Sequence, residues 1–473
     1  MTECNADQLE FHALGRRAVV GDFDGGMISS DGGGLLLGEV EARTKIIERL
    51  GEQFVDYRDA EAIEHTVKDL VGQRVFAQAL GYEDLNDHDR LRLDPLLALL
   101  VGKEDPTGQD RLSERDKGKA LASSSTLNRL ELTPADADAK ARYKKIVANS
   151  EGMDRLLVEI FLEAHEKPPE EIWIDLDATD DPTHGQQEGR FFHGYYGHYC
   201  YLPLYIFSGE HLLCARLRPS NIDASAGSVE ELDWIVGQIR ACWPETKIIV
   251  RGDSGFCREA IMVWCEAHRV DFVLGLAKND RLLALSLDAR IQAQLAYLNS
   301  GESSRVFCEF DYQTRDSWSR QRRVIAKAEH LTKGANPRFV VTSLSTEQAD
   351  ARTLYEDLYC ARGDMENRIK EQQLDLFADR TSTQTMRANQ IRLYFASFAY
   401  VLLCALRREG LEGTEFERAQ CGTIRVKLLK IGAQLRVSVR RIRISFSESY
   451  PYADLFRKIL HNLRAPPLGA GAT

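Results

Sequence analysis

The sequence predicts an α/β protein in which a mixed β-sheet with helices on its faces follows a mostly helical N-terminal domain. In residues 1–165, apolar side chains recur three and four positions apart, which is the spacing of amphipathic helices. From residue 172 onward, short strand-like runs alternate with helical segments, as they do in sheets joined by crossover helices. The EKPPE segment at 166–170 separates the two regions, because a residue before proline avoids the helical conformation.

The N-terminal region, residues 1–168, begins with glycine-rich turns and continues as helices. The turns GDFDGG and DGGG come first, since glycine adopts the backbone angles that tight turns need. Helical spacing then predicts four segments, at 35–50, 59–80, 95–102 and 138–164.

The next region, residues 169–280, has the element order of a mixed sheet. Strands are predicted at 172–179, 197–209, 211–220, 246–256 and 271–279, and helices at 228–243 and 258–269. The break at Gly209-Glu210 predicts a hairpin between the second and third strands. Ser228 followed by Glu231 predicts a capping box. The order β-β-β-α-β-α-β is that of the ribonuclease-H-like fold.

Residues 281–350 are predicted to be a β-rich insertion into this region. Strand-like pieces at 305–314, 322–330 and 338–344 surround a polar loop, RDSWSRQ. Helices are then expected at 353–376 and 388–408, so that 351–408 completes the domain begun at 169–280. One further strand is expected at 436–446, inside a C-terminal segment, 409–473.

Acidic residues cluster where the predicted strands end. Asp175 and Asp177 lie two apart on the first strand and therefore share a face, while Asp253 follows the fourth strand. First and fourth strands are neighbours in a ribonuclease-H-like sheet, which would bring Asp177 and Asp253 together. Crowded carboxylates repel each other unless protonated or bridged by cations, and oxygen ligands suit Mg²⁺ or Mn²⁺. Each aspartate alone also fits an ordinary turn or cap.

A third acid is available on the helix predicted at 353–376. Tyr359, Arg362, Glu366 and Lys370 fall on one face of that helix. A surface helix laced with ion pairs is the simpler interpretation of this face.

The composition excludes several classes of protein. A net charge of −11 excludes a uniformly basic nucleic-acid coat. The most apolar run, at 393–406, is shorter than the roughly 20 residues of a membrane span. The ten cysteines form no CxxC pair, which argues against a zinc site or a disulfide framework and favours a cytoplasmic protein.

Charge is unevenly distributed along the chain. Residues 401–473 hold thirteen Lys and Arg against six acidic residues, a balance of +7. The tail, with VRRIRIS at 439–445, is therefore the expected phosphate-contacting surface.

Eight segments together resemble the DDE transposases of bacterial insertion sequences, in the insertion-sequence-4-like superfamily and most closely its insertion sequence 1380 branch. Each segment alone is weak, but eight in one order are specific. They are DGGMISSDGGGLLL (24–37), GYEDLNDHDRLRLDP (81–95), ASSSTLNRLE (122–131), DLDATDDPTHGQQEG (175–189), LRPSN (217–221), RGDSGF (251–256), LAKNDRL (276–282) and YCARGDMENRIKE (359–371).

The resemblance implies roles for individual residues. Asp177, followed by Ala178-Thr179, matches the first acid of the family, with Asp175 as its competitor; Asp253 matches the second. The signature Tyr-x2-Arg-x3-Glu-x6-Lys matches at Tyr359, Arg362 and Glu366 but has Gln373 in place of its Lys, where Lys370 is a substitute one turn earlier.

The resemblance also implies a mechanism and partners. Asp177, Asp253 and Glu366 would bind two Mg²⁺ ions, or Mn²⁺, that cleave and rejoin phosphodiesters. Tyr359, Arg362 and Lys370 would contact DNA, and Trp318 would stack a displaced base during a hairpin step. The expected partners are terminal inverted repeats, bound through the N-terminal domain, target DNA and a second copy in a homodimer, with no membrane.

Two other interpretations remain open at this point, and two more are disfavoured. A metal-dependent nuclease on the same fold would share the acids without joining strands, and a decayed transposase would bind DNA without catalysis. His184, His193 and His198 follow the first acid and would be ligands in a zinc hydrolase, but no His-x3-His helix supports this. We interpret them as loop or hydrogen-bonding residues. A sugar- or nucleotide-binding protein is disfavoured by the lack of a phosphate-cradling glycine loop.

Overall fold

The computed structural model describes residues 8–465, and the largest of its sheets is mixed. Its strand order is β11-β10-β6-β12-β13-β17-β15-β14, with β16 beside β15. β6 pairs antiparallel with β10 and parallel with β12, so the predicted mixed α/β class is confirmed. The strands are β6 (Glu171–Ala178), β10 (Leu204–Ser208), β11 (His211–Arg216), β12 (Lys247–Gly252), β13 (Asp271–Leu276), β14 (Ser304–Tyr312), β15 (Arg322–Leu331), β16 (Gly334–Ala335) and β17 (Arg338–Thr342).

The strand expected at 197–209 is divided in two. β9 (His198–Tyr201) leaves the main sheet and pairs with β7 (Asp181–Pro182) and β8 (Phe191–His193), whereas β10 stays in it. Pro203 separates them, because proline has no N–H to donate to a ladder. The expected hairpin at Gly209 is present between β10 and β11, with Gly209 at φ 60°.

Helices cover both faces of the sheet. α8 (Ser228–Cys242) and α9 (Glu259–Ala267) pack on the face that carries Ile174 and Leu176. The predicted capping box of α8 is wrong: its cap residue is Gly227, at φ 79°, and the Ser228 hydroxyl is buried without a partner among the described residues.

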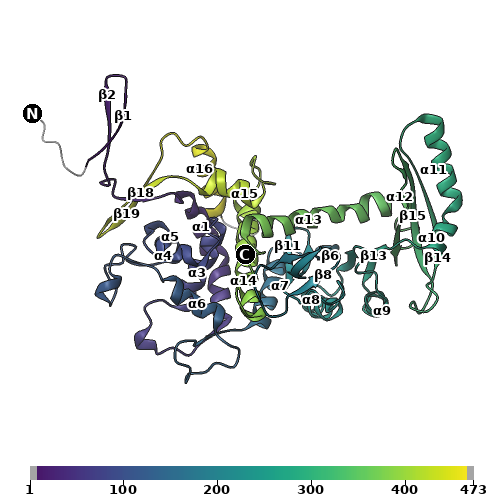
Figure 1. Ribbon diagram of the computed structural model, residues 1–473, viewed down its shortest axis with the longest axis horizontal. Helices are drawn as coiled ribbons and strands as arrows, with labels where there is room; N and C mark the ends of the chain where they lie inside the picture. The colour runs from purple at the N-terminus through teal and green to yellow at the C-terminus, as the bar shows by residue number, and fades with distance from the viewer. Residues whose placement is uncertain (1–7, 466–473) are drawn as a thin grey trace, which may run out of the picture.

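A long helical segment crosses the opposite face (Figure 1). It comprises α12 (Ala351–Thr353), a π-helical turn η5 (Leu354–Tyr359), a 3₁₀ turn η6 (Cys360–Arg362), α13 (Gly363–Lys370) and a second π-helical turn η7 (Glu371–Asp375). Leu354 and Tyr355 bury against Ile249 and Val273 of the sheet. Each π turn shifts the phase of the side chains that follow.

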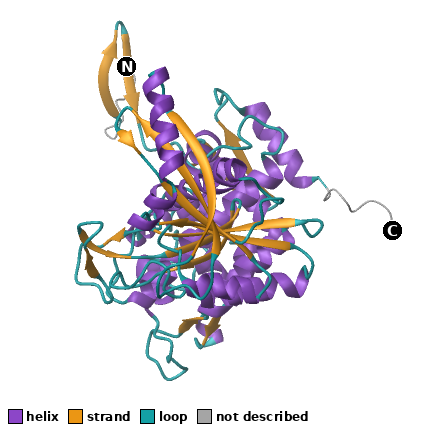
Figure 2. Ribbon diagram, turned by 90° about the vertical axis from the view of Figure 1, so that its right-hand side faces the viewer, coloured by secondary structure: helices purple, strands orange, loops and turns teal. Residues whose placement is uncertain are grey.

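The segment expected to be a β-rich insertion starts with two helices that the sequence did not predict. These are α10 (Asp280–Leu285) and α11 (Leu287–Ser300), and α11 buries only two small side chains, Ala289 and Ala293. The three expected strands are present as β14, β15 and β17, but they extend the main sheet through β13 instead of forming one of their own. Seen from the end that carries α11, the twisted strands fan out (Figure 2).

The N-terminal region is helical, with shorter helices than expected. Lys45, at φ 57°, divides the segment predicted at 35–50, and Asn149 caps the last helix eleven residues after the predicted start at 138. The main helices are α1 (Leu35–Thr44), α2 (Ile46–Glu52), α3 (Val67–Ala79), α5 (Pro95–Val101), α6 (Ser124–Leu132) and α7 (Ser150–Glu163). A hairpin of β1 (Leu9–Leu14) and β2 (Arg17–Gly21), also not predicted, projects beyond them (Figure 1).

The central helix α14 (Met386–Gly410) joins the helical region to the sheet. It packs against α1 and α3 on one side and β11 on the other. Its length and apolarity match those of a membrane span, although no such stretch was expected from the sequence; 94% of its most apolar stretch is buried inside the protein. Core helices of this kind are apolar on all sides.

The C-terminal segment packs onto the N-terminal one. The strand expected at 436–446 is instead a hairpin of β18 (Ala433–Ser438) and β19 (Arg441–Phe446), which reverses at Val439. β18 also pairs with β3 (Met27–Ser29), and α16 (Ala453–Arg464) packs on α1 and α14. The two ends of the chain therefore build one unit.

Candidate active site

Three acidic side chains from distant parts of the chain line one cavity. Asp177 lies near the end of β6, Asp253 directly follows β12, and Glu366 lies on α13. β6 and β12 are parallel neighbours, so their carboxyl ends meet at one edge of the sheet, as expected for α/β ligand sites. The cavity has a volume of about 580 Å³ and is also lined by Arg362 and Lys370.

Asp175 does not belong to this cavity. Its carboxylate is buried and accepts two hydrogen bonds from Arg251, at 2.5 Å from Nε and 2.8 Å from Nη2. It lines a separate cavity beside Trp173 and Asp364. The structure therefore gives Asp175 a cationic partner and leaves Asp177 facing Asp253.

Negative charge is concentrated around Asp177. Burial raises the pKa of Asp177 to about 6; the positive charge of Arg362 opposes the rise, and Asp253 and Glu366 add to it. Arg362 Nη2 lies 2.9 Å from Glu366 Oε1, and its Nη1 lies 3.6 Å from Asp177 Oδ2. The Asp253 carboxylate accepts a hydrogen bond of 2.8 Å from the Gly255 N–H.

The three carboxylates are of the right chemical type to bind a divalent cation, but they are not already arranged around one. Hard cations such as Mg²⁺ and Mn²⁺ take oxygen ligands, and oxygen is all that these side chains offer. Within residues 8–465, no group of three or more His, Cys, Asp or Glu side chains is close enough to hold a metal ion. Arg362 instead neutralises two of the carboxylates that a cation would bind.

The helical segment that supplies Glu366 also carries three of the four predicted DNA-contacting residues, Tyr359, Arg362 and Lys370. The Tyr359 hydroxyl would lie 2.5 Å from a Cβ added at Gly275, so only glycine fits there. Lys370 is exposed and lines the cavity. Gln373 lines it too, but its amide donates to the Asp180 carbonyl at 3.0 Å and so holds the loop after β6.

Trp318 lies apart from the cavity. Its indole is 7% exposed and packs edge-on against Tyr312, with a ring separation of 5.6 Å, and beneath the Arg322 guanidinium. This is a core position in which neither ring face is open to a nucleobase.

The three histidines considered as zinc ligands do not converge. His198 pairs with Asp180 at 2.8 Å, and His193 lines the cavity alongside the acids. His184 lies near Asp379. The zinc interpretation thus finds no ligand set among the described residues.

Two tyrosines at the cavity were missed by sequence reasoning. Tyr195 and Tyr196 lie in the turn between β8 and β9 and line the same cavity as Glu366 and Lys370. Tyr195 is 87% exposed, whereas burial, with help from Asp180 and Asp177, raises the pKa of Tyr196 to about 12. The signal in the sequence is GYYG at 194–197, an aromatic pair set between glycines.

A comparison with protein-family models identifies the family of the chain. The family model for the transposase DDE domain group 1 matches residues 11–468, nearly the whole chain. A comparison with curated proteins gives no match. The matched region holds every acid, helix and strand of the site described above. The chain belongs to the transposase DDE domain family of group 1.

Proposed function

We propose that this transposase binds the terminal inverted repeats of its insertion sequence, cleaves the DNA ends and joins them to target DNA by two-metal phosphodiester transfer. The observation that carries the proposal is the meeting of Asp177, Asp253 and Glu366 in one cavity at the carboxyl edge of adjacent strands. Further support comes from the order β11-β10-β6-β12-β13, which is the ribonuclease-H-like order 3-2-1-4-5. Membership of the insertion-sequence-4-like superfamily and its insertion sequence 1380 branch is part of the proposal.

Asp177, Asp253 and Glu366 would hold the divalent ions. When bound there, the ions would activate a water molecule or a 3′-hydroxyl and would stabilise the negative charge on the leaving oxygen. Arg362 lies among these carboxylates and is positioned to exchange them for a phosphate oxygen when DNA enters. Lys370, exposed at the rim, adds a second positive charge, and Tyr359 buttresses the helix against β13.

A hairpin intermediate requires a platform for an unpaired base. Trp318 would serve only if the loop at 313–321 opened, because the indole is buried. Tyr195 already presents its ring beside the acids, and base stacking on an aromatic ring contributes about 1–3 kcal/mol. The position of Tyr195 therefore favours this residue over Trp318.

Other surfaces support binding of DNA and of a second copy. The β18–β19 hairpin exposes four arginines: Arg436, Arg440, Arg441 and Arg443. On α11, an exposed apolar stripe of Leu287, Ile291, Leu295 and Leu298 is suited to pack against a second molecule. We place the DNA-bound dimer in the cytoplasm, at the nucleoid.

The test uses DNA that carries the inverted repeats bordering the gene. The purified full-length protein should cleave this DNA with Mg²⁺ and join pre-cut ends to a plasmid. The Asp253→Asn protein should bind the same DNA but neither cut nor join it. Cleavage without joining would identify the nuclease alternative, and binding without either would identify the non-catalytic one. Unchanged cleavage by Asp253→Asn would overturn the site.

A further inference from the structure

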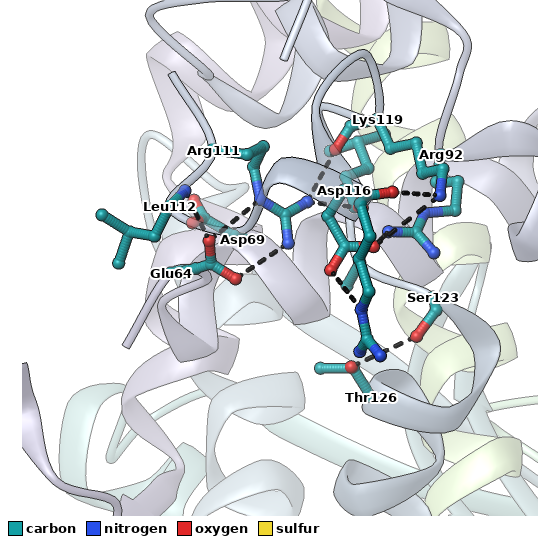
Figure 3. A network of polar contacts seen from close by, with 12 residues as sticks. Glu64, Asp69, Arg92, Arg111, Leu112, Asp116, Lys119, Ser123 and Thr126 are labelled. Carbon is teal, nitrogen blue, oxygen red and sulfur yellow. Dashed lines mark hydrogen bonds and ion pairs between the residues drawn. The ribbon is translucent and has the colours of Figure 1, made fainter. Parts of the chain in front are cut away.

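A second polar cavity, of about 270 Å³, lies in the helical region at the N-terminus of α6. Figure 3 shows its polar network, with Arg111 and Glu64 on one side, Arg92 and Asp116 on the other, and the Ser123 and Thr126 hydroxyls beside them. Five arginines line the cavity together with two carboxylates, Glu64 and Asp116; they are Arg58, Arg92, Arg111, Arg115 and Arg129. Arg58 is neutralised from outside the lining by Asp56, whose carboxylate lies 2.7 Å from its Nη2.

The carboxylates do not neutralise all of this positive charge. Arg111 is held by Glu64 at 2.9 Å, and Arg92 by Asp116 at 3.0 Å. Arg115 also pairs with Asp116, with 3.4 Å between its Nε and the carboxylate, and its side chain is 88% exposed. Arg129 forms no ion pair with any described residue; its guanidinium lies 6.0 Å from the ring of Tyr143. The cavity thus retains excess positive charge and an accessible arginine.

A buried side chain without a partner faces the same cavity. His65 is 5% exposed, and neither of its ring nitrogens has a hydrogen-bond partner among the described residues. Burial, reinforced by Lys103 and Arg111, lowers the pKa of His65 to about 4, so the ring is neutral and carries one N–H donor at pH 7. Leaving such a group unpaired destabilises the fold, and an oxygen ligand in the cavity would relieve this cost.

The start of α6 adds donors suited to an oxyanion. The Ser123 hydroxyl does not cap the helix; it lies 3.0 Å from the Ser125 hydroxyl and 3.3 Å from that of Thr126. Asp89 already accepts hydrogen bonds from the Ser124 N–H, at 3.0 Å, and from the Ser124 hydroxyl, at 2.8 Å. The helix end therefore offers a ligand the Ser125 and Thr126 hydroxyls, which line the cavity.

We propose that this cavity binds a backbone phosphate of DNA, through Arg129, His65 and the Ser125 and Thr126 hydroxyls. A phosphodiester suits the site because its oxygens accept from guanidinium, imidazole and hydroxyl donors at once. This phosphate site rests on the proposed transposase function in one respect, namely that DNA supplies the phosphate. It also accounts for two segments, 81–95 and 122–131, that contribute nothing to the cavity of the acids.

The first experiment measures binding of a fluorescent duplex by the full-length protein as a function of salt. Loss of one phosphate contact should reduce the slope of log K against log salt by about one. Arg129→Gln should show this reduction, while Arg155→Gln, an exposed arginine on α7, should keep the wild-type slope. An equal slope for Arg129→Gln and wild type would overturn the assignment to DNA.

The second experiment asks whether the cavity takes phosphate at all. Inorganic phosphate should raise the melting temperature of the wild-type protein above that in chloride of equal ionic strength. His65→Phe, which keeps an aromatic ring and removes the donors, should abolish most of this rise. A phosphate effect with an unchanged DNA slope would indicate free phosphate as the ligand, and no effect in either experiment would indicate a purely structural ion-pair network; each would overturn the proposal.

Both readouts are independent of catalysis. If the slope changes with Arg129→Gln but the wild-type protein fails to cut or join its own ends, the proposed function fails and the phosphate site stands. If cutting and joining proceed while the slope is unchanged, the phosphate site fails alone.

Discussion

Arg251 holds Asp175 across two paired strands, with its Nε 2.5 Å and its Nη2 2.8 Å from the two carboxylate oxygens. The two residues are direct partners in the parallel register of β6 and β12. Both are buried, and Arg251 also donates to the Leu358 carbonyl on the crossing helix. This ion pair therefore links two strands and a helix next to the acidic cavity.

Replacing Asp175 should cost stability. Asp175→Asn leaves a buried guanidinium without its countercharge, and breaking a buried pair in this way typically costs about 3–5 kcal/mol. Asp177→Asn, two residues along the same strand, should not lower stability, because Asp177 has only a loose contact with Arg362 and is crowded by other carboxylates. Denaturant unfolding of the two variants measures the difference; an equal loss would contradict a structural role specific to Asp175.

Glu366 should be essential for cleavage and dispensable for folding. Its side chain is 48% exposed, so Glu366→Gln should leave the unfolding midpoint unchanged. Substituting a residue that only hydrogen-bonds to a metal ligand typically lowers metal affinity or activity by about 10–100-fold. Loss of a ligand itself should therefore lower Mg²⁺-dependent cleavage by more than about 100-fold. Asp364→Asn is the matched control, because Asp364 lies on the same helix but lines the cavity of Asp175. Comparable losses for both variants would argue against Glu366 as a ligand.

Substitutions of Trp318 and Tyr195 should have opposite effects: the first should lower stability, and the second should slow DNA processing. Trp318→Ala removes a buried indole and should lower the free energy of unfolding by about 3–5 kcal/mol. Tyr195→Ala removes an exposed ring and should change it by less than about 0.5 kcal/mol while slowing second-strand processing of DNA. Thermal unfolding and gel assays of cleaved DNA distinguish these effects; normal processing by Tyr195→Ala would remove this residue from the mechanism.

Stability should fall as the pH drops from about 6.5 to about 4 in phosphate-free buffer. The unfolded chain binds a proton at His65 in that range, whereas the folded protein does not, since burial lowers the pKa of His65 to about 4. This difference removes roughly 3 kcal/mol of stability at the acidic end. His65→Phe should flatten that part of the curve, as measured by urea unfolding at several pH values. Parallel curves for variant and wild type would show that His65 has the same pKa in the folded and the unfolded state.

The stripe on α11 should support self-association. Leu295→Gln and Leu298→Gln together remove apolar surface that is already exposed, so the monomer should fold normally. The DNA complex of the double variant should shift from dimer toward monomer in light scattering. Arg290→Gln, on the same helix but outside the stripe, serves as the control. A dimer that survives the double change would place the interface elsewhere.

The meeting of Asp177 and Asp253 in one cavity could be predicted from the sequence. The element order suggested a ribonuclease-H-like sheet, in which the first and fourth strands are neighbours, and β6 and β12 are indeed paired. The strand limits expected at 172–179 and 246–256 agree with β6 and β12 to within a few residues. The choice between Asp175 and Asp177 required the structure, because side chains two apart share a face and only the position of Arg251 separates them.

Long-range contacts account for most of what the sequence missed. Nothing local indicates that β3 and β18 pair over more than 400 residues. Helix α11 has its larger apolar residues exposed, so the usual burial pattern of a helix is weak there. Trp318 lies in a polar loop and reads as exposed, yet Tyr312 and Arg322, from the strands on either side, enclose it.

Helix α14 fixes the distance between the two cavities at which DNA is proposed to bind. It is buried by α1 and α3 on one side and β11 on the other, so the helical region cannot swing against the sheet without exposing apolar surface. The distance from the α6 cavity to the acids is thereby constant. A duplex held at both places would be cut at a set number of base pairs from its anchored phosphate, and α14 would act as the ruler that sets this number.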